Sequence, residues 1–300
     1  MTRPLVASVA LVASLFAPSA DHQGRDVVFE VVVERANGSF VEGLKAEDFV
    51  VSSGGTERPV GECVVDEGPV SAVLMIDVSS SSRWPGLDDG PQRERWIDDN
   101  LLVQFRGHDR VRLAAFGRRV AMSAGFTTGR SAARRSLAEV MALGEEARSG
   151  PSPIWDALDE AISALEPEPG RRAAILITDG KATANQKDLA DVASRAVLLG
   201  IPVSTVAVGQ GTFLIDQGSN QTAVVSPGLA LQRLSRATGG LAVVMPHGNI
   251  LPSPLTAVSL ALRRAYRISV PMNPGWSRSS GVTVRPRDDR FIYRSSSRSS

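Results

Sequence analysis

The apolar residues of this chain follow two different rhythms. Between residues 27 and 66, short runs rich in Val and Phe are separated by Asn-Gly and Gly-Gly pairs, a pattern typical of short strands joined by tight turns. From residue 70 to residue 266, nearly continuous apolar runs alternate with segments whose apolar residues recur every three or four positions. The first rhythm predicts a small N-terminal β element, and the second predicts strands alternating with helices.

The clearest strands of the second region are "SAVLMIDV", residues 71–78, and "RAAILITDG", which ends in Asp179-Gly180. Strands that are apolar throughout are typical of parallel sheets covered on both faces. The clearest helix is "SPIWDALDEAISAL", residues 152–165, whose apolar residues share one face. Strands alternating with helices pair in parallel through right-handed crossovers. We therefore expect an α/β fold over residues 70–266, with a doubly wound, mostly parallel sheet flanked by helices.

A third pattern ends the chain. Alternating apolar positions at Tyr266, Ile268 and Val270, and again at Val282 and Val284, are separated by a region rich in Pro, Gly and Ser. They predict a β-hairpin-like appendage over residues 267–294. The last residues, 295–300, read "SSSRSS" and have no apolar side chain to bury, so we expect them to be disordered.

The N-terminus has the pattern of a secretory signal peptide over residues 1–20. Arg3 supplies the basic start, Leu5–Phe16 form a short apolar run, and small residues follow. A transmembrane anchor would need roughly 20 apolar residues, which is more than this run provides. We therefore expect a secreted or periplasmic protein with no stable membrane span after signal cleavage.

The amino-acid composition narrows the possible class of protein only slightly. The chain has 300 residues, of which 43% are hydrophobic and 22% are charged, a balance typical of soluble globular proteins. Lys and Arg number 33 against 32 Asp and Glu, so no excess of positive charge indicates a nucleic-acid partner. Cys63 is the single cysteine, which excludes an internal disulfide and suggests a buried structural thiol.

Polar side chains end the predicted strands at one edge of the sheet. Asp77, Ser79 and Ser81 follow the first strand with a spacing of two, so they point the same way. Ser152 lies in the turn before the clearest helix, and Asp179 ends a later strand. In a doubly wound sheet, ligands bind in the crevice beyond the carboxyl ends of the strands. These side chains therefore form the candidate site.

The constellation resembles the metal-ion-dependent adhesion site of von Willebrand factor type A (VWA) domains. In that family an Asp-x-Ser-x-Ser loop is joined by a Thr from a second loop and an Asp from a third. Here "IDVSSS" carries the first element and "ILITDG" the third. The family's Thr falls on Ser152, which keeps the hydroxyl, and Ser80 stands where glycine is usual. The ligands that the resemblance implies are Asp77, Ser79, Ser81, Ser152 and Asp179.

These residue types suit a hard divalent cation. Mg²⁺ takes about six oxygen ligands and keeps several waters, and neutral hydroxyls bind it without cancelling its charge. We expect Mg²⁺, with Mn²⁺ or Ca²⁺ as alternatives. The resemblance implies that a carboxylate of a protein partner completes the coordination. The expected function is therefore that of an exported binding protein, not an enzyme, whose partner presents an acidic side chain.

The resemblance extends beyond this domain. Residues 28–55, together with the terminal "YRISV" and "GVTVRPR", resemble a bacterial secreted family that flanks a VWA domain with β elements. Loop 210–226 is expected on the face of the metal site, as a candidate for partner specificity or as a simple insertion. Lys181 either repels a cation or attracts an acidic ligand.

Ordinary structural roles explain each polar residue taken singly. Ser152 before Pro153 is a typical helix N-cap, and the serines after Asp77 suit a solvated turn. A metal-free scaffold that docks through its β elements is therefore one alternative. A metal-assisted hydrolase is a second, but the sequence has no G-x-S-x-G elbow, H-E-x-x-H helix or P-loop. Its histidines are His22, His108 and His247.

Overall fold

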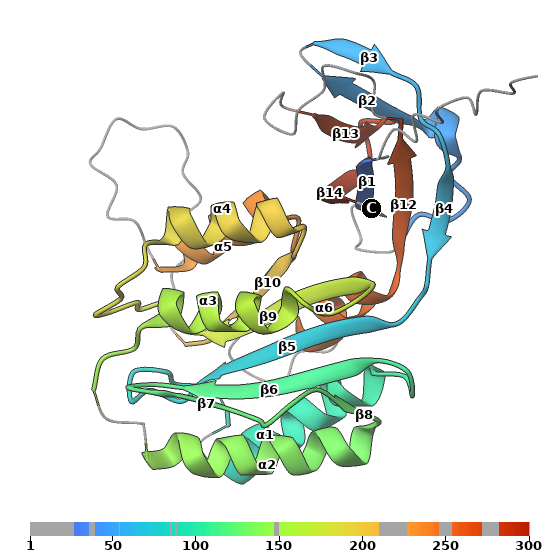
Figure 1. Ribbon diagram of the computed structural model, residues 1–300. Helices are drawn as coiled ribbons and strands as arrows, with labels where there is room; N and C mark the ends of the chain where they lie inside the picture. Colours follow the sequence, from blue (N-terminus) through green and yellow to red (C-terminus); the bar gives the residue numbers. More distant parts are fainter. Residues whose placement is uncertain are drawn as a thin grey trace, which may run out of the picture.

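A computed structural model describes nine stretches of the chain: 27–35, 40–53, 55–84, 86–87, 89–146, 150–209, 227–245, 254–271 and 282–299. Figure 1 shows an α/β unit that carries a smaller, all-β unit at one end. The predicted signal peptide, loop 210–226 and His247 lie outside the described residues.

The α/β unit is built on a sheet with strand order β11-β10-β9-β5-β6-β7, and β8 pairs with β6. Its strands are β5 (Val70–Asp77), β6 (Arg110–Phe116), β7 (Val120–Met122), β8 (Thr127–Thr128), β9 (Arg171–Thr178), β10 (Val203–Ala207) and β11 (Ala242–Val244). Only β7 and β8 run antiparallel to their neighbour in this sheet. The order reverses at β5, because β6 lies on one side and β9 on the other. The predicted doubly wound, mostly parallel α/β sheet is confirmed.

Helices cover both faces of this sheet. They are α1 (Gly90–Asn100), α2 (Arg130–Glu146), α3 (Ile154–Leu165), α4 (Leu189–Leu199), α5 (Pro227–Thr238) and α6 (Pro254–Arg263), with short 3₁₀ turns η1 (Ala46–Asp48) and η2 (Leu102–Gln104). Buried residues of α1, α2 and α6 pack in one core cluster, and those of α3, α4 and α5 pack in the other. The sheet is therefore the middle layer of three.

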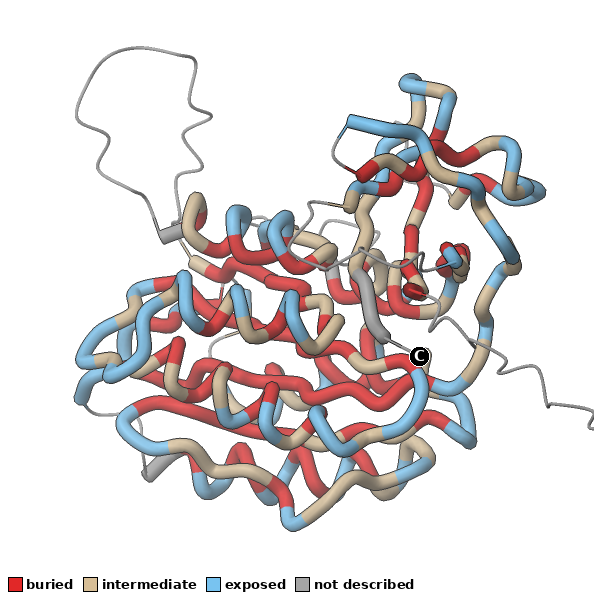
Figure 2. The backbone as a smooth tube through the Cα atoms, turned by 45° about the horizontal axis from the view of Figure 1, so that its top comes forward, coloured by how far each residue is buried: buried red, intermediate tan, exposed pale blue. Residues whose placement is uncertain are grey.

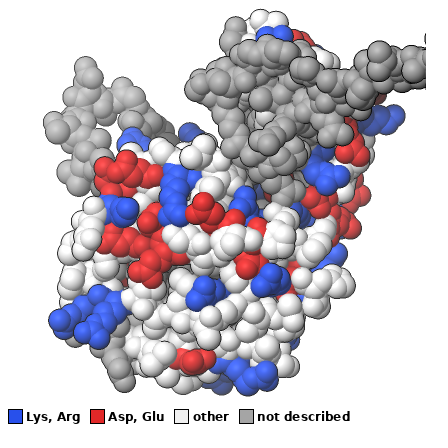
Figure 3. All heavy atoms as spheres, in the orientation of Figure 1, with Lys and Arg blue, Asp and Glu red and all other residues white. Residues whose placement is uncertain are grey.

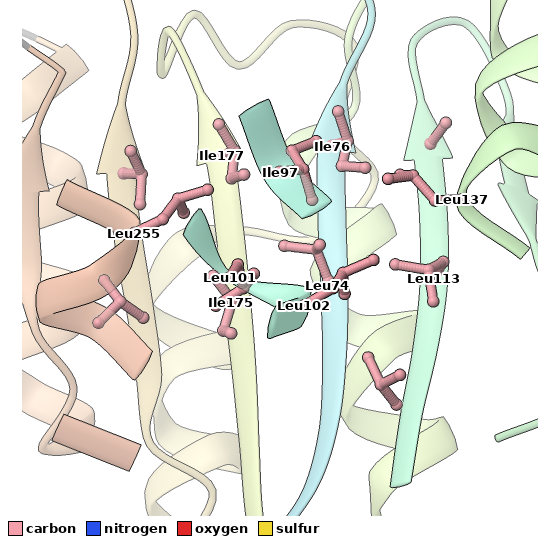
Figure 4. Close-up of a cluster of buried hydrophobic side chains, with 14 of the residues drawn as sticks. Leu74, Ile76, Ile97, Leu101, Leu102, Leu113, Leu137, Ile175, Ile177 and Leu255 are labelled. Atoms are coloured by element: carbon pink, nitrogen blue, oxygen red, sulfur yellow. The ribbon is translucent and has the colours of Figure 1, made fainter. Parts of the chain in front are cut away.

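Strand β5 supplies both cores because its side chains alternate between the two faces. All eight of its residues are buried. Leu74 and Ile76 pack with Ile97 of α1, as Figure 4 shows, whereas Val73 and Met75 face the α3 side. Fully burying one such side chain stabilises the fold by roughly 1.5–3 kcal/mol. This burial fixes the strand whose end carries Asp77.

The all-β unit is a sandwich of two sheets, with strand orders β14-β1-β12-β4 and β13-β2-β3. Its strands are β1 (Val27–Glu34), β2 (Phe49–Ser53), β3 (Thr56–Arg58), β4 (Cys63–Asp66), β12 (Ala265–Val270), β13 (Thr283–Pro286) and β14 (Ile292–Ser299). Phe29, Phe49 and Tyr266 are buried in its core. Residues 27–66 and 265–299 both contribute strands to this sandwich, so the α/β unit is inserted between its halves.

The C-terminal region differs from its prediction in two ways. The runs at Tyr266 and Val284 do not form a hairpin: β12 pairs with β1 and β4, and β13 pairs with β2 in the other sheet. Residues 295–299, expected to be disordered, form the second half of β14 and pair with Val27–Val31. A strand at a sheet edge gains its order from backbone hydrogen bonds, so it does not need apolar side chains.

The sandwich joins the α/β unit at the amino ends of the parallel strands. Arg171, the first residue of β9, donates from Nη1 to the Asp66 carbonyl at 3.1 Å, and its Nε lies 3.5 Å from Glu30 Oε2. The carboxyl ends of β5 and β9 point away from the sandwich (Figure 1). Figure 2 shows that the buried backbone is concentrated in the interior of the α/β unit. No helix within the described stretches is long and apolar enough to span a membrane.

Candidate metal centre

Asp77 ends the central strand at the point where the strand order reverses. It is fully buried, and its carboxylate oxygens are both engaged. Oδ1 accepts a hydrogen bond from the Ser79 backbone N–H at 2.9 Å, and Oδ2 accepts from the Thr178 hydroxyl at 2.6 Å. The two bonds fix the orientation of this carboxylate at the carboxyl edge of the sheet.

The electrostatics of Asp77 favour a nearby cation. Burial raises the pKa of its carboxyl group, and the hydrogen bonds from Ser79 and Thr178 offset only part of that rise. The negative charge of Asp179 raises the pKa further. Two carboxylates therefore lie close enough at this edge to repel each other, and a divalent cation beside them would relieve that repulsion.

The serines after Asp77 form a tight turn in which the Ser82 N–H donates to the Ser79 carbonyl at 3.0 Å. Ser79 is buried, Ser81 is exposed, and their hydroxyl oxygens lie 3.3 Å apart. Ser82 instead accepts a hydrogen bond from Trp84 Nε1 at 3.3 Å. The structure thus brings Ser79 and Ser81 together as predicted, and a wholly solvated turn does not describe them.

Ser152 does not have the capping role that its position suggests. Helix α3 begins at Ile154 with Pro153 as the N-cap residue, and the Trp155 N–H of its first turn donates to Asn185 Oδ1 at 2.8 Å, not to Ser152. The Ser152 hydroxyl is buried, at 3% exposure, and forms no hydrogen bond. Its backbone is fixed by Thr183, whose hydroxyl accepts from the Ser152 N–H at 2.8 Å and whose N–H donates to the Ser152 carbonyl at 2.9 Å. The N-cap interpretation of Ser152 is therefore wrong.

Asp179 follows β9, and one of its carboxylate oxygens accepts no hydrogen bond. Its Oδ1 accepts a hydrogen bond from the Lys181 N–H at 3.0 Å. Its Oδ2 is buried and accepts no hydrogen bond, although the Lys181 ammonium lies 3.6 Å away. Because Thr183 belongs to the same loop, its bonds to Ser152 hold the second and third loops of the site together.

Two residues that support the site were missed from the sequence. Thr178 orients Asp77, and its hydroxyl also accepts the Gly180 N–H at 3.0 Å. Thr183 holds Ser152. The sequence signal that could have identified them is a hydroxyl residue close to a candidate aspartate. Metal ligands are commonly oriented by hydrogen bonds from such neighbouring groups.

The arrangement supplies oxygen ligands alone. Buried polar atoms without a hydrogen bond are rare and need an explanation, and the Ser152 hydroxyl and Asp179 Oδ2 are two of them at one edge. Over the described ranges, no three His, Cys, Asp or Glu side chains form a metal-binding group, so a cation here would depend on hydroxyls. Such a donor set fits a hard divalent cation. His108 lies before β6, at the opposite edge of the sheet.

Comparison with known proteins identifies the class of this fold. The profile of the von Willebrand factor type A domain matches residues 72–181, from β5 to the loop after β9. The chain therefore contains a VWA domain, and the matched segment includes all of the predicted ligands.

Solved structures show the same fold at low sequence identity. Proximal thread matrix protein 1 from the mussel byssus, solved with a zinc-occupied MIDAS motif, is 18% identical with a TM-score of 0.50, covering 68% of this chain and 48% of that one. Manganese-loaded TRAP from Plasmodium vivax is 15% identical with a TM-score of 0.46, covering 83% and 97%. BatB from Bacteroides thetaiotaomicron is 20% identical with a TM-score of 0.48, covering 64% and 97%. No curated protein matches the chain.

Proposed function

We propose that this protein binds a divalent cation at the carboxyl edge of its parallel sheet and binds a protein partner through that cation. The observation that carries the proposal is the Ser152 hydroxyl, which is buried and unpartnered while its backbone is held by Thr183. A hydroxyl fixed in place without a partner is costly unless a ligand satisfies it. The proposed ligands are Asp77, Ser79, Ser81, Ser152 and Asp179.

The donor set also indicates how a partner would bind. Asp77 and Asp179 contribute negative charge, whereas the serine hydroxyls are neutral, so the cation keeps affinity for a further anionic oxygen. Ser81 is exposed, which leaves that side of the site open to a partner. A carboxylate from the partner would complete the coordination. Mg²⁺ is the proposed cation, and proximal thread matrix protein 1 holds zinc in its own MIDAS motif.

We further propose that the protein is exported and acts by protein binding, as in cell adhesion, without catalysis. The pattern of residues 1–20 supports secretion or delivery to the periplasm. The position of the sandwich supports a binding role, because it lies at the amino edge and leaves the carboxyl edge accessible (Figure 1).

The metal site is tested by isothermal titration of Mg²⁺ and Mn²⁺ into the purified protein and two matched variants. Ser81→Ala removes a proposed ligand, and Ser80→Ala makes the same change at the exposed neighbouring position. We expect Ser81→Ala to weaken binding roughly 10- to 100-fold, the range for damaged metal sites. Ser80→Ala should bind as the wild type does.

Equal binding by wild type and Ser81→Ala would contradict the site. Binding of a partner is tested separately, by capture from an envelope extract with Mg²⁺ or with EDTA. A partner retained by Mg²⁺, released by EDTA and not captured by Ser81→Ala would support the proposal. Capture of a partner that is unaffected by EDTA and by Ser81→Ala would instead support a metal-free scaffold.

A further inference from the structure

We infer that the partner's metal-binding carboxylate lies within an acidic segment, because positive side chains surround the site. Resting on the proposed function, this inference specifies the kind of partner. Four exposed residues form what we call the basic rim: Arg83, Arg118, Arg119 and Lys181. They come from three separate loops at the carboxyl edge of the sheet.

Arg118 and Arg119 lie in the β6–β7 turn, immediately beside the first ligand loop. Phe116 is the register partner of Asp77, and its carbonyl accepts a hydrogen bond from the Val78 N–H at 2.9 Å. The Arg118 side chain extends toward the second ligand loop: its Cδ lies 3.3 Å from where a Cβ on Gly150 would stand. Gly150 is two residues from Ser152.

Arg83 and Lys181 belong to the other two sides of the rim. Arg83 directly follows the serine turn, and its carbonyl lies 3.2 Å from where a Cβ on Gly209, just after β10, would stand. Lys181 now lies 3.6 Å from Asp179 Oδ2. A cation bound to that oxygen would displace the ammonium, which then joins the rim. Lys181 thus attracts an acidic ligand once the metal is present.

The arginines of the rim are not neutralised within the described structure. Arg83, Arg118 and Arg119 form no side-chain hydrogen bond or ion pair with any described residue. The described acids of neighbouring loops are occupied, since Asp89 accepts from the Gln92 N–H and Asp156 from the Gln186 and Lys187 N–H groups.

Several basic side chains in other parts of the described structure are paired with acids. Figure 3 shows acidic and basic groups interspersed over α3 and α4, where Arg195 binds Asp159 at 2.7 Å and Glu166 at 2.8 Å. In the sandwich, Arg294 binds Glu34 through two hydrogen bonds of 2.8 Å. Because the chain as a whole is nearly neutral, with a net charge of +1, the grouping of four basic residues around one site is a local feature.

A local positive surface favours partner segments that carry negative charge close to the point of contact. Exposed charges interact over about 10 Å at moderate salt, so the rim attracts acidic side chains within a few residues of the bound carboxylate. The metal prefers a carboxylate to a sulfate ester as its ligand. The structure therefore favours an acidic peptide segment over a sulfated polysaccharide.

The inference is tested by measuring peptide affinity with excess Mg²⁺ at low salt. One probe is a Gly/Ser peptide with a single central Asp, and the other carries Glu residues on both sides of that Asp. We expect the Glu-flanked peptide to bind more tightly, and the preference to disappear at about 0.5 M salt. Arg83→Ala, Arg118→Ala and Arg119→Ala should each reduce that preference about two- to fivefold, the range for exposed ion pairs.

Arg236→Ala is the matched control, because Arg236 is exposed on α5 near Gly239, which lies against Ser295 of the sandwich. It should leave the preference unchanged. Metal-dependent binding of both peptides with equal affinity would overturn the basic rim alone. Absence of metal-dependent binding to either peptide would overturn the proposed function. Tight binding of a heparin oligosaccharide in EDTA, equal to that in Mg²⁺, would show a metal-independent polyanion site and also overturn the inference.

Discussion

At the scale of the residue, the account depends on oxygen atoms that the fold buries without partners. The motif "IDVSSS" was enough to name Asp77, Ser79 and Ser81 from the sequence. Ser152 was ambiguous, because a serine before a helical proline looks the same whether it caps the helix or binds a metal. Its hydroxyl without a hydrogen bond argues against the capping role. The rim arginines were not predicted, since exposed charges follow no periodicity.

Replacing Ser152 with Ala separates the two roles. A lost N-cap costs about 1 kcal/mol of stability. Removing an unpartnered buried hydroxyl should instead leave the metal-free protein within about 0.5 kcal/mol of the wild type. We expect unchanged unfolding in urea with EDTA, together with roughly tenfold weaker Mn²⁺ binding. A destabilised variant that still binds Mn²⁺ normally would restore the N-cap interpretation.

At the scale of the element, apolar runs alternating with helical periodicity were enough to predict the mostly parallel sheet of the α/β unit and helix α3. Helix α2 was not predicted, although Ala133, Leu137, Val140 and Met141 have helical spacing and are buried. Helix α1 ends earlier than the stripe of Ile97, Leu101 and Phe105 suggests, because the chain continues as the 3₁₀ turn η2. Local periodicity identifies an element better than it identifies the element's end.

One buried ion pair connects β5, β6 and α6. Asp109 is 1% exposed, and it accepts hydrogen bonds from the Val70 N–H at 3.0 Å and from the Arg106 N–H and the Arg263 guanidinium. Burial alone would raise the pKa of Asp109, but the hydrogen bonds from these three groups and the charge of Arg263 outweigh it and lower the pKa. Its ionised form therefore stabilises the folded state.

Asp109→Asn should destabilise the protein by roughly 3 kcal/mol at neutral pH, as expected for breaking a buried ion pair. A lowered pKa gives stability that is fully present above the ordinary aspartate pKa of about 3.9 and is lost as the pH falls through the lower folded-state value. The difference between wild type and variant in urea unfolding should therefore shrink in acid. Asp99→Asn, at a position 69% exposed, is the control and should change stability by less than about 1 kcal/mol. A difference that grows in acid would contradict this assignment.

At the scale of the whole molecule, the sandwich lies at the opposite end of the α/β unit from the site. Residues 27–34 and 292–299 pair side by side in one sheet of the sandwich, although most of the chain lies between them. Short strands could be predicted from alternation, but their partners could not, because pairing is decided by contacts far apart in sequence. The α/β unit thereby presents its carboxyl edge at the end opposite the sandwich.

The proposed function requires that the carboxyl edge of the parallel sheet hold one divalent cation among hydroxyls and carboxylates. The most direct test is a crystal structure of the full protein with Mn²⁺, located by its anomalous scattering. We predict one strong peak in contact with the Ser79 and Ser81 hydroxyls, with Ser152 and Asp179 bound directly or through water. Ordered Mn²⁺ at other positions only, with the Ser152 hydroxyl still unpartnered, would contradict the account.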